Sequence, residues 1–244
     1  MSNCLVIQHV ACEGLGTIGP ELKRYGFGAD FIRIFKNDTV PRAFPRGCSA
    51  LIILGGPMGV YEDGVYPFIK DELNLIESAL KEDVPIFGVC LGSQMIAKAA
   101  GAAVYKGKAK EIGWYKARLT QEGMNDNLFL GMPEEFTVFQ WHGDTFDLPK
   151  GAANLVSSKL FENQAIRVGK NAYGLQFHLE VTEKMIFEWI KTNAGELKAM
   201  KGVIDPEEII KETPNRIEAL KRHGVAVISR FLRMVQGGCE ICGH

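Results

Sequence analysis

The sequence lacks any long apolar run. None of its 244 residues belongs to a stretch near the roughly 18 consecutive apolar residues that a membrane-spanning helix requires. The chain enters an apolar segment at Leu5 without a preceding basic region or small-residue cleavage site. These absences argue against a membrane protein and against secretion, and we expect a cytoplasmic location.

An excess of charge of one sign is also missing. The chain has 28 Lys and Arg against 29 Asp and Glu, and its formal net charge is -1. Because the two signs are mixed along the chain, no basic surface for nucleic acid or for an anionic membrane is predicted. We expect small-molecule or protein partners, and the protein partners considered include a second copy of this chain in a homodimer.

Cysteine is scarce, and its six positions do not suggest a disulfide framework. A chain of this size buries enough core to fold without disulfides, so reduced thiols are expected. Only Cys239-x-x-Cys242, followed by His244, has the spacing of a zinc half-site. A closed tetrahedral site needs a fourth ligand, and no second cysteine pair exists. We therefore expect an unliganded tail, with neither a metal nor a cofactor.

Apolar strands alternate with amphipathic helices in the first hundred residues. Continuous apolar runs at 5–7, 31–35, 50–54 and 85–89 are separated by helical patterns at 20–25 and 67–81. Strands that are apolar throughout are buried on both faces, as in a parallel sheet covered by helices. The sequence therefore predicts an α/β fold with a mainly parallel sheet.

The pattern changes after Gly101, where strand-like pieces follow one another with few helices between them. We predict these strands at 102–105, 112–119, 136–140, 155–158, 165–168 and 172–177. They indicate antiparallel additions to the parallel core. A helix is predicted at 182–192, residues 195–202 are predicted to form a linker, and two further helices are expected at 205–212 and 214–235.

A cysteine flanked by glycines marks the end of the fourth predicted strand. Gly88-x-Cys90-x-Gly92 lies between that strand and a helical run, which is the layout of a nucleophile elbow. The tight turn leaves no room for flanking side chains, and the helix N-terminus favours a thiolate. The alternative is a buried core thiol, but such a residue does not need two bracketing glycines.

A cysteine nucleophile needs an imidazole and a third group that orients it. Of the five histidines, His178 has the best context, because an apolar strand leads to it and Glu180 follows two positions later on the same side. A strand-end histidine followed by a helix-capping acid would have the same spacing without catalytic meaning. The remaining histidines are His9, His142, His223 and His244.

Three separated segments agree with this chemistry: Leu54-Gly55-Gly56-Pro57, Gly88 to Gln94, and Gly174 to Glu180. Together they resemble the class I glutamine amidotransferases, and especially stand-alone proteins similar to the amidotransferase domain of GMP synthase. The resemblance covers residues 4–192. It implies that Cys90 attacks the side-chain amide of glutamine, with His178 as acid and base and Glu180 as its orienting carboxylate.

The resemblance implies roles for further residues. The backbone N–H groups of Gly56 and Leu91 would form an oxyanion hole, and Gly55 and Gln94 would contact the substrate. The segment Trp141-His142-Gly143-Asp144 matches the lining of the pocket for the amino-acid end of the substrate, although a polar turn between strands is the alternative. Leu179 replaces the proline of the usual His-Pro-Glu, and leucine allows the same extended backbone.

We therefore expect a flavodoxin-like α/β domain over residues 1–194 and a helical C-terminal extension over 195–244 that packs on it. No segment resembles the Ser-Gly-Gly-x-Asp-Ser loop of nucleotide activation, so the ammonia would either feed a partner synthetase or be released by a plain hydrolase.

Three alternatives remain open. They are hydrolysis of another γ-glutamyl amide, a regulatory or binding subunit that keeps the fold, and a redox protein in which Cys90 is oxidised. The His178-x-Glu180 pair argues against the last.

Overall fold

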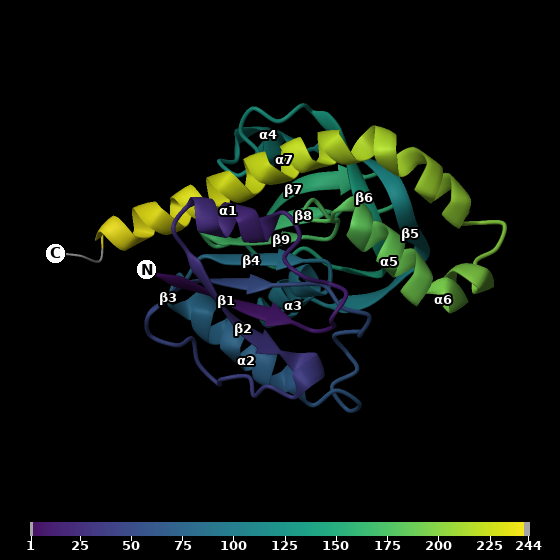
Figure 1. The fold of residues 1–244 in the computed structure, drawn as a ribbon. Coiled ribbons are helices and arrows are strands. Elements are labelled where there is room, and N and C mark those ends of the chain that lie inside the picture. The colour runs from purple at the N-terminus through teal and green to yellow at the C-terminus, as the bar shows by residue number, and fades with distance from the viewer. Residues whose placement is uncertain (1, 242–244) are drawn as a thin grey trace.

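The computed structural model describes residues 2–241, with side chains as far as residue 237. Within this part of the chain the strands form one nine-stranded sheet (Figure 1). Its parallel half has the strand order β2-β1-β3-β4-β9, which is the flavodoxin-like order. These strands are β2 (Gly28–Arg33), β1 (Asn3–Gln8), β3 (Cys48–Ile53), β4 (Ile86–Val89) and β9 (Ala172–Leu175). The predicted fold class is confirmed.

An antiparallel half continues the same sheet beyond β9 in the order β8-β7-β5-β6. Its strands are β8 (Ala165–Val168), β7 (Ala153–Ser158), β5 (Val104–Leu119) and β6 (Glu135–Phe146). The sequence predicts β5 as two pieces, but it is one strand whose pairing with β6 is interrupted between Lys106 and Glu111. The strand predicted at 136–140 extends to Phe146, so residues 141–144 lie in a strand and not in a turn.

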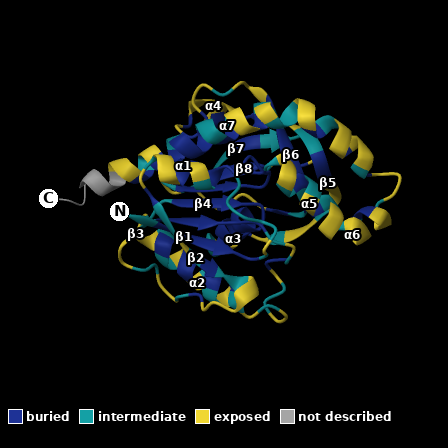
Figure 2. Cartoon of the chain, in the orientation of Figure 1, coloured by how far each residue is buried: buried dark blue, intermediate teal, exposed yellow. Residues whose placement is uncertain are grey.

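Side-chain alternation along the parallel strands builds a core on each face of the sheet. On β1, Val6 belongs to one buried cluster, whereas Leu5 and Ile7 belong to the other. Helices α2 (Phe68–Lys81) and α3 (Leu91–Ala99) cover one face, and α1 (Ile18–Arg24) and α7 (Pro206–Ile241) lie over the other (Figure 1). Figure 2 shows the buried strands between helices whose outer faces are exposed.

Local signals explain most element boundaries but not all. The run predicted as a strand at 31–35 ends earlier, because the short 3-10 helix η1 (Ile34–Lys36) follows β2. Helix α4 (Gln121–Asn125) was not expected from the sequence, although Thr120 caps it by accepting a hydrogen bond from the Gly123 N–H at 3.0 Å.

The linker predicted at 195–202 is wrong. Helix α5 (Glu183–Thr192) is followed directly by helix α6 (Ala194–Ala199), and Leu197 is buried in the core. The residues between Gly195 and Gly202 have high helix propensity, and Leu197 among them packs into the core.

The two helices predicted at 205–212 and 214–235 are one continuous helix, α7, with Pro214 inside it. Proline costs about 3 kcal/mol inside a helix, and it removes one backbone hydrogen bond. The helix continues because Ile209 before the proline and Leu220 after it are both buried in the same core. Tertiary packing therefore outweighs the local signal.

Helix α7 contributes directly to the central core. Its Leu220, Val227, Phe231 and Leu232 are buried, and the ring of Phe231 lies 5.2 Å from that of Phe87 on β4, measured between centroids. Within residues 2–241 no helix combines the length and the apolarity needed to cross a membrane. The Cys239, Cys242 and His244 side chains lie outside the described part of the chain.

Replacing Phe231 with alanine tests whether the extension and the sheet share one core. We expect Phe231→Ala to lower the free energy of unfolding by about 3 to 5 kcal/mol, because it empties a buried aromatic site. Urea unfolding measures this, and Ile210→Ala, at an exposed position of the same helix, is the matched control with an expected loss below about 1 kcal/mol. Equal losses in the two variants would show that α7 does not belong to the core.

Candidate functional site

Cys90 has a backbone conformation that residues other than glycine rarely adopt. Its φ is 51° and its ψ is -105°, at the junction of β4 and α3. Both neighbouring glycines are sterically required. A Cβ at Gly88 would lie 2.6 Å from the carbonyl carbon of Gly92, and a Cβ at Gly92 would lie 2.3 Å from the Ile53 carbonyl oxygen. The segment therefore has the tight strand-to-helix geometry that the glycine spacing predicts, and the role of Cys90 as a nucleophile stays a prediction.

The elbow is tied to the neighbouring strand. The Cys90 N–H donates to the carbonyl oxygen of Leu175 on β9 at 2.8 Å, and α3 begins at the next residue. Within the described residues the Leu91 N–H has no hydrogen-bond partner, as is usual in the first turn of a helix. The thiol thus lies at the carboxyl edge of the sheet beside a free backbone donor.

His178 and Glu180 form a buried pair directly after β9. The Nδ1 atom of His178 lies 2.7 Å from Oε1 of Glu180. Backbone hydrogen bonds to Phe139 on β6 hold the histidine, and its ring packs against Trp189 with centroids 4.8 Å apart. These contacts fix the orientation of the imidazole.

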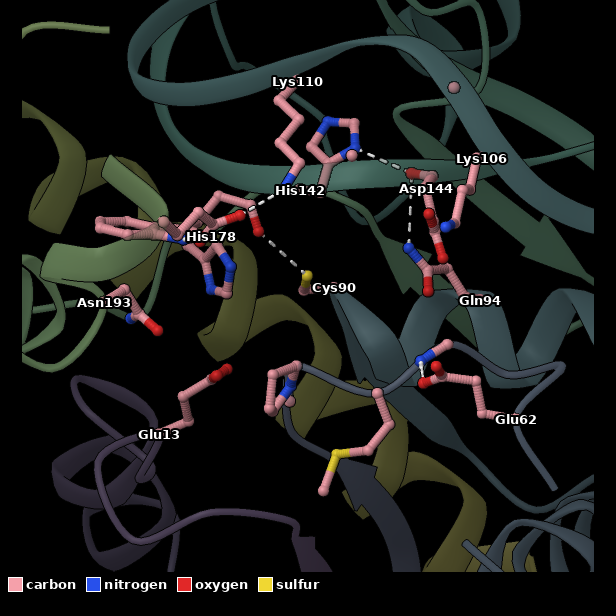
Figure 3. Close-up of a pocket in the computed structure, with 18 of the residues that line it drawn as sticks. Glu13, Glu62, Cys90, Gln94, Lys106, Lys110, His142, Asp144, His178 and Asn193 are labelled. Atoms are coloured by element: carbon pink, nitrogen blue, oxygen red, sulfur yellow. Dashed lines mark hydrogen bonds and ion pairs between the residues drawn. The ribbon is translucent and has the colours of Figure 1, made fainter. Parts of the chain in front are cut away.

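The electrostatic surroundings of His178 favour the imidazolium. Burial lowers the pKa of His178, but the charge of Glu180, its hydrogen bond to the ring and the nearby Cys90 thiol outweigh it, so the pKa lies well above 6.5. Figure 3 shows the two side chains, Cys90 and His178, at the same pocket. The arrangement favours the protonated form of His178 beside Cys90.

The Gly55-Gly56 turn packs against the elbow. A Cβ at Gly56 would lie 3.0 Å from the Leu91 side chain, and a Cβ at Gly55 would lie 3.5 Å from the Cβ of Cys90. Within the described residues the Gly56 N–H has no hydrogen-bond partner. Gly56 lines the pocket, whereas Gly55 does not. The substrate contact expected of Gly55 stays a prediction.

Cys90 opens into a pocket of about 560 Å³, between the parallel half of the sheet, the antiparallel half and α6. The residues of the 141–144 segment line it, as does Gln94. The Gln94 amide nitrogen donates to Gln176 Oε1 at 3.1 Å and reaches the Asp144 carbonyl oxygen at 3.5 Å. These predicted residues therefore meet around Cys90, as Figure 3 shows.

The 141–144 segment is held from several sides. Tyr61 donates its hydroxyl hydrogen to Asp144 Oδ2 at 2.9 Å, and burial together with Asp144 raises the pKa of Tyr61 to about 12. Both ring nitrogens of His142 are already bonded, Nδ1 to the Asp144 carbonyl oxygen at 2.9 Å and Nε2 to Glu111 Oε2 at 3.1 Å. His142 thus lines the pocket with its ring nitrogens occupied.

Several pocket residues were missed by sequence reasoning. Residues 106–110 leave the β5 ladder and bring three lysines to the wall, and α6 contributes Glu196. Glu196 pairs with Lys110 and accepts from Trp141 Nε1 at 3.1 Å. A lysine-rich gap between two strand pieces was the available signal for 106–110. For Glu196 there was none, because it lies in the region predicted as a linker.

Glu13 is another missed residue, from the loop after β1. Its half-buried carboxylate faces the pocket (Figure 3) and makes no hydrogen bond or ion pair within residues 2–237. Burial raises its pKa, the charge of His178 lowers it and that of Glu180 raises it, with a net increase. A carboxylate without a hydrogen-bond or ion-pair partner in this part of the chain therefore lines the same pocket as Cys90.

Comparison with known proteins identifies the family of the chain. The family model for class-I glutamine amidotransferases matches residues 20–188, which is most of the chain. The chain belongs to this family. The resemblance found in the sequence is thereby confirmed, and the family is one of glutamine-amide hydrolysing enzymes.

Relatives of this amidotransferase span stand-alone and fused proteins. The chain is 29% identical over 199 residues to the glutamine amidotransferase-like protein YfeJ of Salmonella typhimurium, covering 80% of this chain and 83% of that protein. It is 34% identical over 146 residues to the glutamine-hydrolyzing GMP synthase of Staphylococcus carnosus, covering 59% of this chain and 26% of the synthase. The crystal structure of a glutamine amidotransferase from Thermotoga maritima is 38% identical, with a TM-score of 0.85, covering 95% of this chain and 98% of that one.

Titration of His178 tests the electrostatics of this amidotransferase site. We expect its imidazole to stay protonated at pH 7 by NMR, and Glu180→Gln to lower its pKa, because the neighbouring charge is lost. A raised histidine pKa stabilises the fold fully below pH 6.5 and loses this effect as the pH rises through the folded-state pKa.

The difference in the pKa of His178 between wild type and Glu180→Gln should also change the pH dependence of stability. The gap in unfolding free energy between wild type and Glu180→Gln should be largest near about pH 6 and shrink at higher pH. A gap that does not change with pH would contradict this interpretation.

Proposed function

We propose that this protein hydrolyses the side-chain amide of glutamine to glutamate and ammonia through a Cys90, His178 and Glu180 triad. The observation that carries the proposal is the thiol of Cys90, held by a strained backbone turn in the same pocket as the His178 imidazole, which the buried Glu180 carboxylate orients. Membership of the class-I amidotransferases supports the substrate. The pocket is open enough to admit an amino acid.

The first half of the reaction forms a thioester. The Cys90 thiolate attacks the carbonyl carbon, Cδ, of the glutamine side-chain amide, and the carbonyl π electrons move to the oxygen. The imidazolium of His178 gives its proton to the departing nitrogen, the C–N bond breaks, and ammonia leaves. Glu180 keeps the ring oriented throughout and stabilises its positive charge.

The second half releases glutamate. Neutral His178 takes a proton from water, the hydroxide attacks the thioester, and the C–S bond breaks to restore the Cys90 thiolate. In both halves the negative oxygen would face the N–H groups of Gly56 and Leu91. Their freedom from other hydrogen bonds supports this assignment.

The polar groups of the outer pocket suit the amino-acid end of the substrate. Lys106 supplies positive charge for an α-carboxylate, and Asp144 supplies negative charge for an α-ammonium. The ammonia would pass to a partner synthetase. The match to the amidotransferase part of GMP synthase, which spans only a quarter of that enzyme, supports this partner class.

Removal of the thiol tests the nucleophile. We expect Cys90→Ala to reduce ammonia release from glutamine by about 10³-fold or more, because no thioester can form. Cys48→Ala, at a half-buried cysteine on β3, is the matched control and should keep full activity. Equal ammonia release by Cys90→Ala and wild type would refute the triad.

A second candidate function follows from Glu13. Its unpaired carboxylate lies close enough to His178 for the two charges to interact, and His178 would protonate the leaving nitrogen. A γ-glutamyl amide whose amine carries a second, positive group would place that group near Glu13. The same triad would then hydrolyse a γ-glutamylated diamine.

Paired substrates test this alternative. We expect Glu13→Gln to lower kcat/KM about tenfold for a γ-glutamyl diamine, because an ion pair is lost. Hydrolysis of a neutral γ-glutamyl alkylamide should be unchanged. Loss of the same size for both substrates would assign Glu13 to general packing and not to specificity.

A further inference from the structure

His9 lies beneath the Gly55-Gly56 turn, just after β1. It is buried, and both of its ring nitrogens are hydrogen-bonded. Nδ1 lies 3.0 Å from the Gly55 carbonyl oxygen, and Nε2 lies 3.0 Å from Oε2 of Glu72 on α2. The turn rests closely on the histidine, since a Cβ at Gly56 would lie 2.9 Å from the His9 Cβ.

The hydrogen-bond partners determine the state of the ring. A carbonyl oxygen and a carboxylate oxygen are both acceptors, so each ring nitrogen must donate while Glu72 is ionised. Burial lowers the pKa of His9, but Glu72, the bond to Gly55 and the charge of Glu13 outweigh it, and the net shift is upward. The charged groups that face His9 are thus Glu72 and Glu13.

Peptide geometry links this pair to the reaction. The Gly55 carbonyl and the Gly56 N–H belong to one planar trans peptide, so they point in opposite directions. A donor that holds the oxygen on the His9 side therefore directs the N–H to the other side. Gly56 is one of the residues that line the Cys90 pocket.

We propose that His9, held by Glu72, is a positioning residue that fixes and polarises the Gly55-Gly56 peptide, so that its N–H is set in advance for the oxyanion. The inference rests on the function proposed above. An N–H whose carbonyl receives a bond from a cation is a stronger donor, because bonded peptides polarise one another. The pair contacts no substrate and acts only through the turn.

Stability alone is a weak reason for such a pair. Both side chains are fully buried, and Oε1 of Glu72 has no hydrogen-bond partner within the described residues. Buried ion pairs are often no more stabilising than apolar residues of similar volume, and an unpaired buried oxygen adds a cost. A role in arranging the turn accounts for their position under it.

Two amide variants separate the two hydrogen bonds. The amide nitrogen of asparagine falls near the position of Nδ1, and that of glutamine near the position of Nε2, so His9→Asn keeps the bond to Gly55 and His9→Gln loses it. We expect His9→Gln to lower kcat for glutamine about 10²-fold with little change in KM. The displaced N–H would no longer stabilise the oxyanion, which exists in the transition state and not in the bound substrate. The kcat of His9→Asn should be at least tenfold higher than that of His9→Gln.

Controls make the experiment decisive. His223→Gln, at a half-buried histidine of α7, should keep wild-type kcat. Glu72→Gln, which removes the charge and keeps the size, should lower kcat without changing KM, and it provides the test if a His9 variant does not fold. Equal kcat in His9→Asn and His9→Gln, or wild-type kcat in Glu72→Gln, would overturn the proposal.

Failure of this proposal can be told apart from failure of the proposed function. If Cys90→Ala is inactive while both His9 variants match wild type, only the role of His9 is wrong. If Cys90→Ala keeps full activity, the triad itself is wrong. Alkylation of Cys90 by iodoacetamide needs no oxyanion hole, so its rate should be the same in His9→Gln and wild type.

Discussion

The positive-φ backbone of Cys90 is the constraint on which the rest of the site depends. A positive φ at a residue other than glycine costs of order 1 to 3 kcal/mol, and it persists only when its surroundings impose it. Here Gly88 and Gly92 leave no space for side chains, and the bond from Cys90 to the Leu175 carbonyl holds the turn against β9. The turn directs the thiol outward from the sheet edge and starts α3 beside it.

The topology brings the other groups to the same place. In a parallel sheet the strands end at one edge, so the residues after β1, β3, β4 and β9 meet there. These are His9, Gly55, Cys90 and His178. The antiparallel half and α6 then form the outer wall. There Glu196 pairs with Lys110 of β5 and accepts a hydrogen bond from Trp141 of β6. The residues around Cys90 are thus positioned by the ends of parallel strands, and the outer wall of the pocket is formed by the antiparallel half and α6.

The inner site was predictable from sequence because it depends on local patterns. Glycine spacing and strand ends locate Cys90 and His178, and both are found at the pocket. The outer wall was not predictable, since Glu196 reaches the site only through packing of α6, and the continuation of α7 through Pro214 depends on buried contacts. His9 was one of five candidate histidines, and its partner Glu72 lies far away in sequence. Long-range contacts of this kind leave no local signal.

The central claim is that Cys90 carries the γ-glutamyl group during turnover. Acid quenching of the protein during glutamine turnover, followed by mass spectrometry of its peptides, measures this most directly. We expect a γ-glutamyl adduct on the peptide that contains Cys90 and on no other cysteine peptide. An adduct on a different residue, or turnover by a chain whose Cys90 peptide stays unmodified, would contradict it.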